Sequence, residues 1–220
     1  MVTQIAKIIL VFMFILITSI IAFVLDRLSK NAVLKYAFGL DFPDPAKFGH
    51  SVPVIEDVFH LTYHGNTGMA FGMLAGNKTL LICLCAIILT LICFAIYKLK
   101  PRKWIEKISF GIIIGGAIGN VVDRILYGFV IDFLDFCLIN YPIFNVADCF
   151  VVVGAILLSL YIIFFDKKED EAQWKKVLWV FAIIGASCPP KEWPIIYISL
   201  IFSLFSNNLI AETASSITSS

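Results

Sequence analysis

Four apolar runs divide the chain and predict its architecture. Residues 8–25 and 80–97 each hold eighteen residues without a charged side chain, and a helix of that length is just long enough to cross the hydrocarbon core of a bilayer. Residues 108–122 form a third uncharged run, and residues 144–165 form a fourth that holds one charge, Asp148. The pattern predicts an all-α integral membrane protein with four transmembrane helices.

The third run differs from the others in its glycine content. Its glycines are Gly111, Gly115, Gly116 and Gly119. Small residues at this spacing let helix backbones approach closely in a bilayer, where no hydrophobic effect drives helices together. We therefore expect residues 108–122 to pack tightly against neighbouring helices.

The connection between the first two runs, residues 26–79, carries strand signals. Residues 52–55 and 58–63 are rich in β-branched and aromatic side chains, which favours short strands. Residues 65–68 have the sequence Gly-Asn-Thr-Gly, typical of a turn. The apolar residues 69–74 are expected to lie along the membrane surface. The sequence thus predicts a small β-containing cap, with a surface segment, on one membrane face.

Basic residues predict the orientation of the helices. The short connection between the second and third runs holds Lys98, Lys100, Arg102, Lys103 and Lys107. After the fourth run come Lys167, Lys168, Lys175 and Lys176. Connections rich in Lys and Arg face the cytoplasm, so the N-terminus is expected there and residues 26–79 and 127–143 on the outer side. The Lys and Arg residues of the first outer loop are spread out and balanced by acids, which weakens this prediction without reversing it.

The composition agrees with a membrane protein. Hydrophobic residues make up 60% and charged residues 15% of the chain, and the mean hydropathy is +0.93, whereas a soluble domain is nearer half apolar and a quarter charged. The net charge of +1 gives no indication of a nucleic-acid partner. Cys83, Cys85 and Cys93 lie inside one apolar run and read as small core residues, and the spacing of Cys137 and Cys149 leaves their pairing open.

The pattern of apolar and charged residues changes after the fourth run. Residues 166–176 are highly charged, and the two apolar runs that follow, 177–186 and 194–204, are shorter than a comfortable span. Further spans, a re-entrant pair and a surface-lying segment all remain open here. We therefore divide the chain into a four-helix membrane domain, residues 1–168, and a C-terminal extension of undetermined topology, residues 169–220.

Polar residues gather at one end of the expected bundle. The outer ends of the third and fourth helices and the loop between them hold Asn120, Asp123, Arg124, Asp132, Asp135, Asn145 and Asp148. A charge at the centre of a membrane helix costs about 2.5–3.5 kcal/mol on insertion scales, so each such group is expected to have a structural or functional role that offsets this cost. Two carboxylates in one low-dielectric site keep one proton between them. The ionised member can then activate water while the protonated member polarises a carbonyl. The arrangement allows such a pair, with Asp132 and Asp148 among the candidates, without requiring it.

Several of these residues also have a structural interpretation. Taken alone, Asp148 would cap the start of the fourth helix. Asp123 and Arg124 are interpreted as an interfacial ion pair that ends the third helix. Asp26 and Lys30 are four residues apart and are expected to pair with each other.

Two histidines raise the question of a metal site. His60 and His64 are spaced so that both lie on one face of a strand. A zinc site normally uses three or four protein ligands, and no nearby cysteine or third histidine completes such a set. We therefore interpret both histidines as solvated loop side chains and expect no metal.

Five sequence blocks, taken in order, resemble a known family. They are DRLSK at 26–30, NTGMAF at 66–71, GGAIGNVVDR at 115–124, VIDF at 130–133 and FNVAD at 144–148. These blocks are similar to those of bacterial lipoprotein signal peptidase, also called signal peptidase II. The similarity covers roughly residues 5–165. Any single block would be a weak indication, whereas five in this order are highly specific.

The resemblance implies an inner-membrane aspartic endopeptidase with four spans and a site that faces the outer, periplasmic side. Its substrates would be prolipoproteins that carry a diacylglyceryl group on the lipobox cysteine, and cleavage would occur just before that cysteine. The resemblance implies no metal and no other cofactor. It also implies membrane lipid as the surroundings and globomycin-type cyclic peptides as inhibitors.

The resemblance also implies roles for individual residues. Asp132 and Asp148 match the catalytic aspartates. Polar positions that line or support the substrate site are matched by Asn66, Gly68, Asn120, Arg124 and Asn145. Further motif positions, whose role looks structural, are matched by Asp26, Lys30 and Asp123. Two departures, Met69 in place of the usual alanine and His64-Gly65 before the second block, bear on substrate fit.

Two other classes of function account for only part of this pattern. Acids inside a membrane also mark proton-coupled transporters, but a proton relay places acids at several depths and the first two runs contain none. A purely structural protein leaves the clustering of polar groups at one face unexplained.

Overall fold

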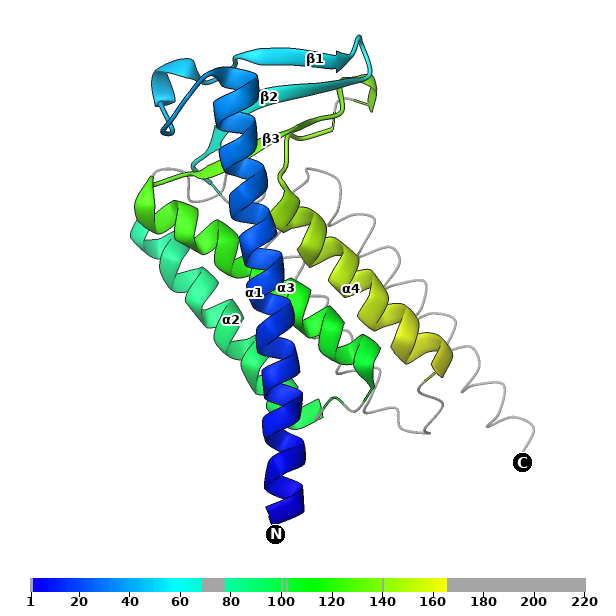
Figure 1. Ribbon diagram of the computed structural model, residues 1–220. Helices are drawn as coiled ribbons and strands as arrows, with labels where there is room; N and C mark the ends of the chain where they lie inside the picture. Colours follow the sequence, from blue (N-terminus) through cyan, green and yellow to red (C-terminus); the bar gives the residue numbers. More distant parts are fainter. Residues whose placement is uncertain (1, 69–77, 100, 102, 140, 166–220) are drawn as a thin grey trace, which may run out of the picture.

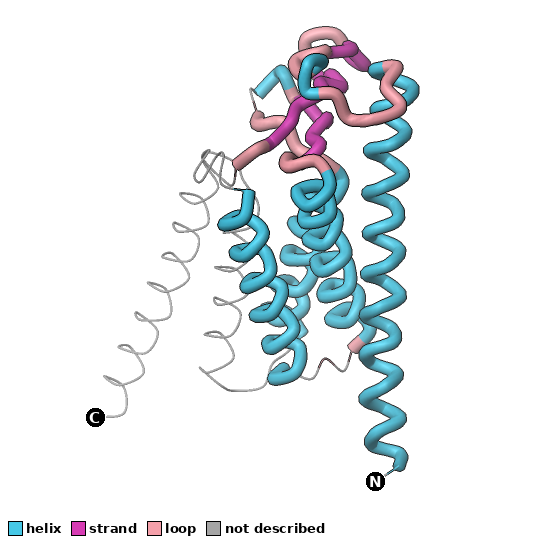
Figure 2. Tube along the Cα trace, turned by 90° about the vertical axis from the view of Figure 1, so that its left-hand side faces the viewer, coloured by secondary structure: helices cyan, strands magenta, loops and turns pink. Residues whose placement is uncertain are grey.

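The computed structural model describes residues 2–68, 78–99, 101, 103–139 and 141–165. Its helices are α1 (Val2–Phe38), α2 (Lys78–Leu99), α3 (Trp104–Leu126) and α4 (Val146–Phe165). They run side by side, and a small sheet covers one end of the bundle (Figures 1 and 2). All four apolar runs are therefore helical, as predicted. The expected surface segment 69–74 and the extension 169–220 lie outside the described residues.

Helix α1 continues well past the apolar run that predicted it. The run ends at residue 25, but the helix reaches Phe38 and stops at Gly39, whose φ of 67° suits glycine. A buried stripe explains the extension, because it follows helical spacing through the charged residues: Ile15, Ser19, Ala22, Asp26, Lys30, Leu34 and Phe38. Residues 26–38, which were expected to belong to a loop, are therefore helical.

Helix α3 lies at the centre of the bundle and packs against α1, α2 and α4. Its glycines are at the contacts with two neighbours. A Cβ atom added at Gly115 would meet the backbone of Ser19 on α1, and one added at Gly116 would lie 2.5 Å from the carbonyl oxygen of Ala147 on α4. The expectation of close helix packing along this run is confirmed.

Gly116→Ala is expected to lower the free energy of unfolding by about 1–3 kcal/mol, a typical cost of overpacking. The added methyl group would push against the Ala147 carbonyl oxygen and also lie 3.2 Å from Val151, so α3 and α4 would have to separate. Thermal unfolding of the purified chain in detergent measures the effect. Leu126→Ala is the control, because that side chain is 62% exposed. Equal midpoints for Gly116→Ala and the wild type would contradict the packing.

The sheet has three antiparallel strands in the order β1-β2-β3. They are β1 (Ser51–Ile55), β2 (Phe59–Asn66) and β3 (Val130–Asp135). The sequence predicted the first two, although β2 runs on through Gly65 and Asn66, where a turn was expected. The third strand was missed, because the segment was taken for a loop.

One face of the sheet carries an apolar cluster that ties it to the end of α1. Leu34 and Phe38 of α1 are buried there with Tyr63 of β2 and with Ile131 and Phe133 of β3. Tyr63 stacks on Phe38 with ring centroids 5.5 Å apart. Side chains of a strand alternate between faces, so residues between these, such as Asp132, face the bundle. The cluster thereby fixes the height of the sheet above the helices.

Two helices are long and apolar enough to cross a membrane on length and composition. Within the described part of the chain, they are residues 9–38 of α1 and Trp104–Leu126 of α3. Shorter apolar stretches occupy Cys85–Phe94 within α2 and Val146–Tyr161 within α4.

Candidate active site

Strand β3 places Asp132 over the end of the helix bundle. Asp132 is 1% exposed and stands opposite His64 in the register of β2 and β3. Asn66, two residues further along β2, donates from Nδ2 to Asp132 Oδ2 at 3.1 Å. The pairing of β2 with β3 therefore supplies one hydrogen-bond donor to this acid.

The first turn of α4 places Asp148. Asn145 precedes the helix, and its Oδ1 accepts from the backbone N–H of Asp148 at 3.0 Å. In return, Asp148 Oδ2 accepts from the backbone N–H of Asn145 at 3.2 Å. This reciprocal arrangement is a capping box. The capping role expected of Asp148 is confirmed, and it occupies one oxygen of the carboxylate.

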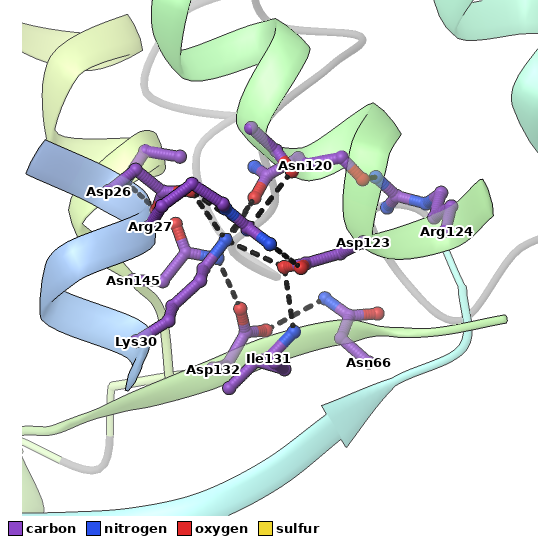
Figure 3. Close-up of polar contacts among 12 residues, drawn as sticks. Asp26, Arg27, Lys30, Asn66, Asn120, Asp123, Arg124, Ile131, Asp132 and Asn145 are labelled. Carbon is purple, nitrogen blue, oxygen red and sulfur yellow. Dashed lines mark hydrogen bonds and ion pairs between the residues drawn. The ribbon is translucent and has the colours of Figure 1, made fainter. Parts of the chain in front are cut away.

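Two asparagine amides connect the two acids. Asn120 of α3 donates from Nδ2 to the other oxygen of Asp148 at 2.8 Å. Asn145 donates from Nδ2 to Asp132 Oδ1 at 2.6 Å and to Asn120 Oδ1 at 3.1 Å. Figure 3 shows these amides between β3 and the helices. The structure therefore brings together Asp132, Asp148 and the three asparagines that the motifs singled out, Asn66, Asn120 and Asn145.

Burial and charge both act on the ionisation of Asp132. Removal from water raises the pKa of its carboxyl well above the usual range, and the nearby carboxylate of Asp148 raises it further. Lys30 and the amides of Asn66 and Asn145 act in the opposite direction. Two carboxyls coupled in this way release their protons in two separate steps. The arrangement favours a form in which the pair carries one proton.

An ion cluster lies behind the two acids, between α1 and α3. Lys30 Nζ is 3.0 Å from Asp26 Oδ2 and 2.7 Å from Asp123 Oδ2. Arg27 binds the same two carboxylates, at 3.0 Å and 2.6 Å. Lys30, Asp26 and Asp123 are all fully buried. The predicted pairing of Asp26 with Lys30 is confirmed as part of a larger cluster.

The predicted ion pair between Asp123 and Arg124 was wrong. Asp123 turns toward Lys30 and Arg27, while Arg124 points the other way and donates to the carbonyl oxygen of Gly68 at 3.0 Å. Neighbouring residues of a helix project about 100° apart and do not face each other. Arg124 thus joins α3 to the segment after β2.

Gly68 continues that connection toward the acids. Its backbone N–H donates to Asn66 Oδ1 at 3.1 Å, which leaves the Nδ2 of Asn66 directed at Asp132. Arg124 and Gly68 therefore act on the site indirectly, through the orientation of one amide.

The remaining predicted polar residues lie apart from the two acids. Asp135, at the far end of β3, accepts from Thr62 Oγ1 at 2.6 Å. His60 Nδ1 lies 3.2 Å from Ser51 Oγ on β1. In the part of the chain that the structure describes, no group of three His, Cys, Asp or Glu residues could hold a metal ion. Cys137 and Cys149 are both free thiols.

Four contacts of the ion cluster were not expected. Arg27 has two carboxylate partners, although no role was predicted for it. Asp123 Oδ2 also accepts from the backbone N–H of Ile131 on β3, and Asp26 Oδ1 accepts from that of Ala147 on α4. Backbone partners leave no signal in the side-chain sequence. The position of Arg27 inside the first motif block was the one available indication.

Comparison with known proteins places the chain in a family. The profile described as signal peptidase (SPase) II matches residues 18–164. The chain belongs to this family. All the site residues named above fall within the matched range, and residues 169–220 fall outside it.

Relatives and solved structures agree with the assignment. A lipoprotein signal peptidase from Halothermothrix orenii is 40% identical over 66% of this chain and 92% of its own length. One from Clostridioides difficile is 40% identical over 66% of this chain and 91% of its own. A solved bacterial membrane enzyme matches with a TM-score of 0.57 and 29% identity, over 71% of this chain and 93% of the other. The chain is therefore a membrane protein and an aspartic endopeptidase of the signal peptidase II type.

Proposed function

We propose that this enzyme removes signal peptides from diacylglyceryl-modified prolipoproteins by cutting just before the lipidated cysteine, with Asp132 and Asp148 as the catalytic pair. The name of the relatives supports the class of substrate. The observation that carries the residue assignment is the linkage of two buried carboxyls, Asp132 and Asp148, through the amides of Asn120 and Asn145.

In the proposed reaction, one aspartate is ionised and the other keeps its proton. We assign the proton to Asp132, because it is the more buried of the two and Asp148 lies at the positive end of the α4 dipole. Asp148 takes a proton from water, and the water oxygen attacks the scissile carbonyl carbon. Asp132 donates its proton to the carbonyl oxygen. When the tetrahedral intermediate collapses, Asp148 gives the proton it took from water to the leaving nitrogen, the C–N bond breaks, and Asp132 takes a proton back from a hydroxyl of the intermediate.

The surrounding residues have positioning roles in this proposal. Asn66, Asn120 and Asn145 hold the two carboxyls by the hydrogen bonds described above. Arg124 and Gly68 fix the segment after β2 beside the pair. No metal and no other cofactor takes part, and globomycin-type peptides would act by occupying the same site.

The proposed topology has α1, α2, α3 and α4 as four spans, in the inner membrane, with a cytoplasmic N-terminus. The sheet and the acid pair then lie at the outer face, because the Lys-rich connection between α2 and α3 is at the opposite end of these helices. Residues 1–168 form the peptidase domain and residues 169–220 a separate extension.

The proposal is tested with the purified full chain in lipid vesicles. A prolipoprotein carrying the diacylglyceryl group should be cut, and mass spectrometry should place the new N-terminus at the modified cysteine. The matched control is the same precursor without the lipid, which should remain intact. A chelator should leave the cleavage rate unchanged, since the proposal involves no metal. Cleavage of both precursors at equal rates, or of neither, would refute the proposed specificity.

A further inference from the structure

Lys30 forms ion pairs with two carboxylates and, in addition, a hydrogen bond with a neutral amide. Its ammonium group is fully buried and has three N–H donors. Two of them meet the carboxylates of Asp26 and Asp123. The third contact is with Oδ1 of Asn120 at 3.2 Å, and Asn120 is the residue that donates to Asp148.

Arg27 provides an internal comparison on the same helix. It binds the same two carboxylates as Lys30, but its further hydrogen bond goes to the backbone carbonyl oxygen of Gly119 at 3.2 Å. It is also partly exposed, with 18% of its side chain accessible. The two cations thus share their ion-pairing partners and differ in their contact with the Asn120 amide.

The donors around Asn120 determine which way its amide points. An ammonium group donates and cannot accept, so the end of the amide that meets Lys30 has to be its oxygen. The same oxygen accepts from Asn145. With the oxygen held there, the NH₂ group is directed at Asp148 Oδ1. If the amide were flipped, its NH₂ group would face the N–H donors of Lys30 and Asn145, and its oxygen would face Asp148 Oδ1.

We propose that Lys30 is a positioning residue of the acid pair, which acts through the Asn120 amide by holding its NH₂ group toward Asp148. This inference rests on the proposed function of Asp132 and Asp148. It assigns Lys30 a role in the reaction, beyond the stability of the helix contact. The side chain itself does not reach the substrate, because it is fully buried.

The test compares two double variants that leave the ion cluster equally charged. Asp26→Asn with Lys30→Met removes one cation and one anion, and so does Asp26→Asn with Arg27→Met. The first is expected to lower kcat by about 10- to 100-fold with KM unchanged, because a misplaced catalytic group affects the reaction step. The second is expected to keep kcat within about threefold of the wild type, since Lys30 still holds Asn120. The single variant Lys30→Arg, which retains an N–H donor at this position, should keep most of the wild-type kcat.

A second readout does not depend on cleavage. In the wild type and in the Arg27 double variant, the side-chain NH₂ signals of Asn120, assigned by their loss in Asn120→Ala, should be resolved and slow to exchange with solvent in nuclear magnetic resonance spectra. In the Lys30 double variant they should exchange fast. If the wild type cleaves no precursor, the proposed function fails, while these signals still decide the orientation of the amide.

Two outcomes would overturn the role of Lys30. One is an equal loss of kcat in both double variants at equal amounts of folded protein, which would mean that Lys30 acts on stability alone. The other is a fast-exchanging Asn120 NH₂ group in the wild-type chain, which can be measured even if the Lys30 double variant does not fold.

Discussion

Asp132→Asn is expected to abolish cleavage of the lipidated precursor and to leave the chain folded. An asparagine has nearly the same shape and can still accept from Asn145 through its remaining oxygen, but it holds no exchangeable acid proton. Loss of one member of a general acid–base pair lowers the rate by about 10²- to 10⁴-fold. Asp148→Asn should have an effect of the same order. The cleavage rate at saturating substrate measures both.

Asp135→Asn is the matched control for this experiment. It lies on the same strand and changes the same functional group, but its carboxylate bonds to Thr62 and lies apart from Asn120 and Asn145. Its rate should stay within about threefold of the wild type, as for a residue outside the reacting groups. Persistent cleavage by Asp132→Asn would remove Asp132 from the mechanism. An Asp135→Asn variant as inactive as Asp132→Asn would show that the assay responds to any change in β3.

The length of the apolar runs was sufficient to predict where the helices are, because each run had to be buried or face lipid. It was not sufficient for the end of α1. Asp26 and Lys30 interrupted the apolar run, and their charge was read as the start of a loop. Only the three-dimensional packing shows that Leu34 and Phe38 continue the same buried stripe.

The sheet was only partly predictable for a similar reason. Strands β1 and β2 are bounded by turn residues and rich in β-branched and aromatic side chains. Strand β3 has the same composition, but the charged Asp132 stands in its middle. A buried acid in a strand contradicts ordinary strand patterns, and such conflicts between local pattern and fold are expected at functional sites.

The membrane depth of the polar residues predicted that they would converge, but not which would bind to which. Asp123 was paired with its sequence neighbour Arg124, whereas the rotation of α3 turns it toward α1. The two interpretations of Asp148, as a helix cap and as a member of an acid pair, were treated as alternatives. The structure combines them, because one carboxylate oxygen serves the cap and the other accepts from Asn120.

Asp123→Ala is expected to cause a large loss of stability, about 3–5 kcal/mol in the free energy of unfolding, as for other buried ion pairs that lose one partner. Lys30 and Arg27 would then share the single carboxylate of Asp26, and the buried N–H of Ile131 would lose its acceptor. Denaturant or thermal unfolding in detergent measures the change.

Charge balance provides the control that identifies the cause. If the loss in Asp123→Ala comes from an uncompensated buried cation, removing one cation as well should recover part of it. Arg27→Ala added to Asp123→Ala leaves Lys30 paired with Asp26, so this double variant should be more stable than Asp123→Ala alone. A packing defect would instead make the losses additive. A double variant that is less stable than Asp123→Ala would therefore contradict the electrostatic explanation of the cluster, since removal of a charge can raise stability only where that charge was left without a partner.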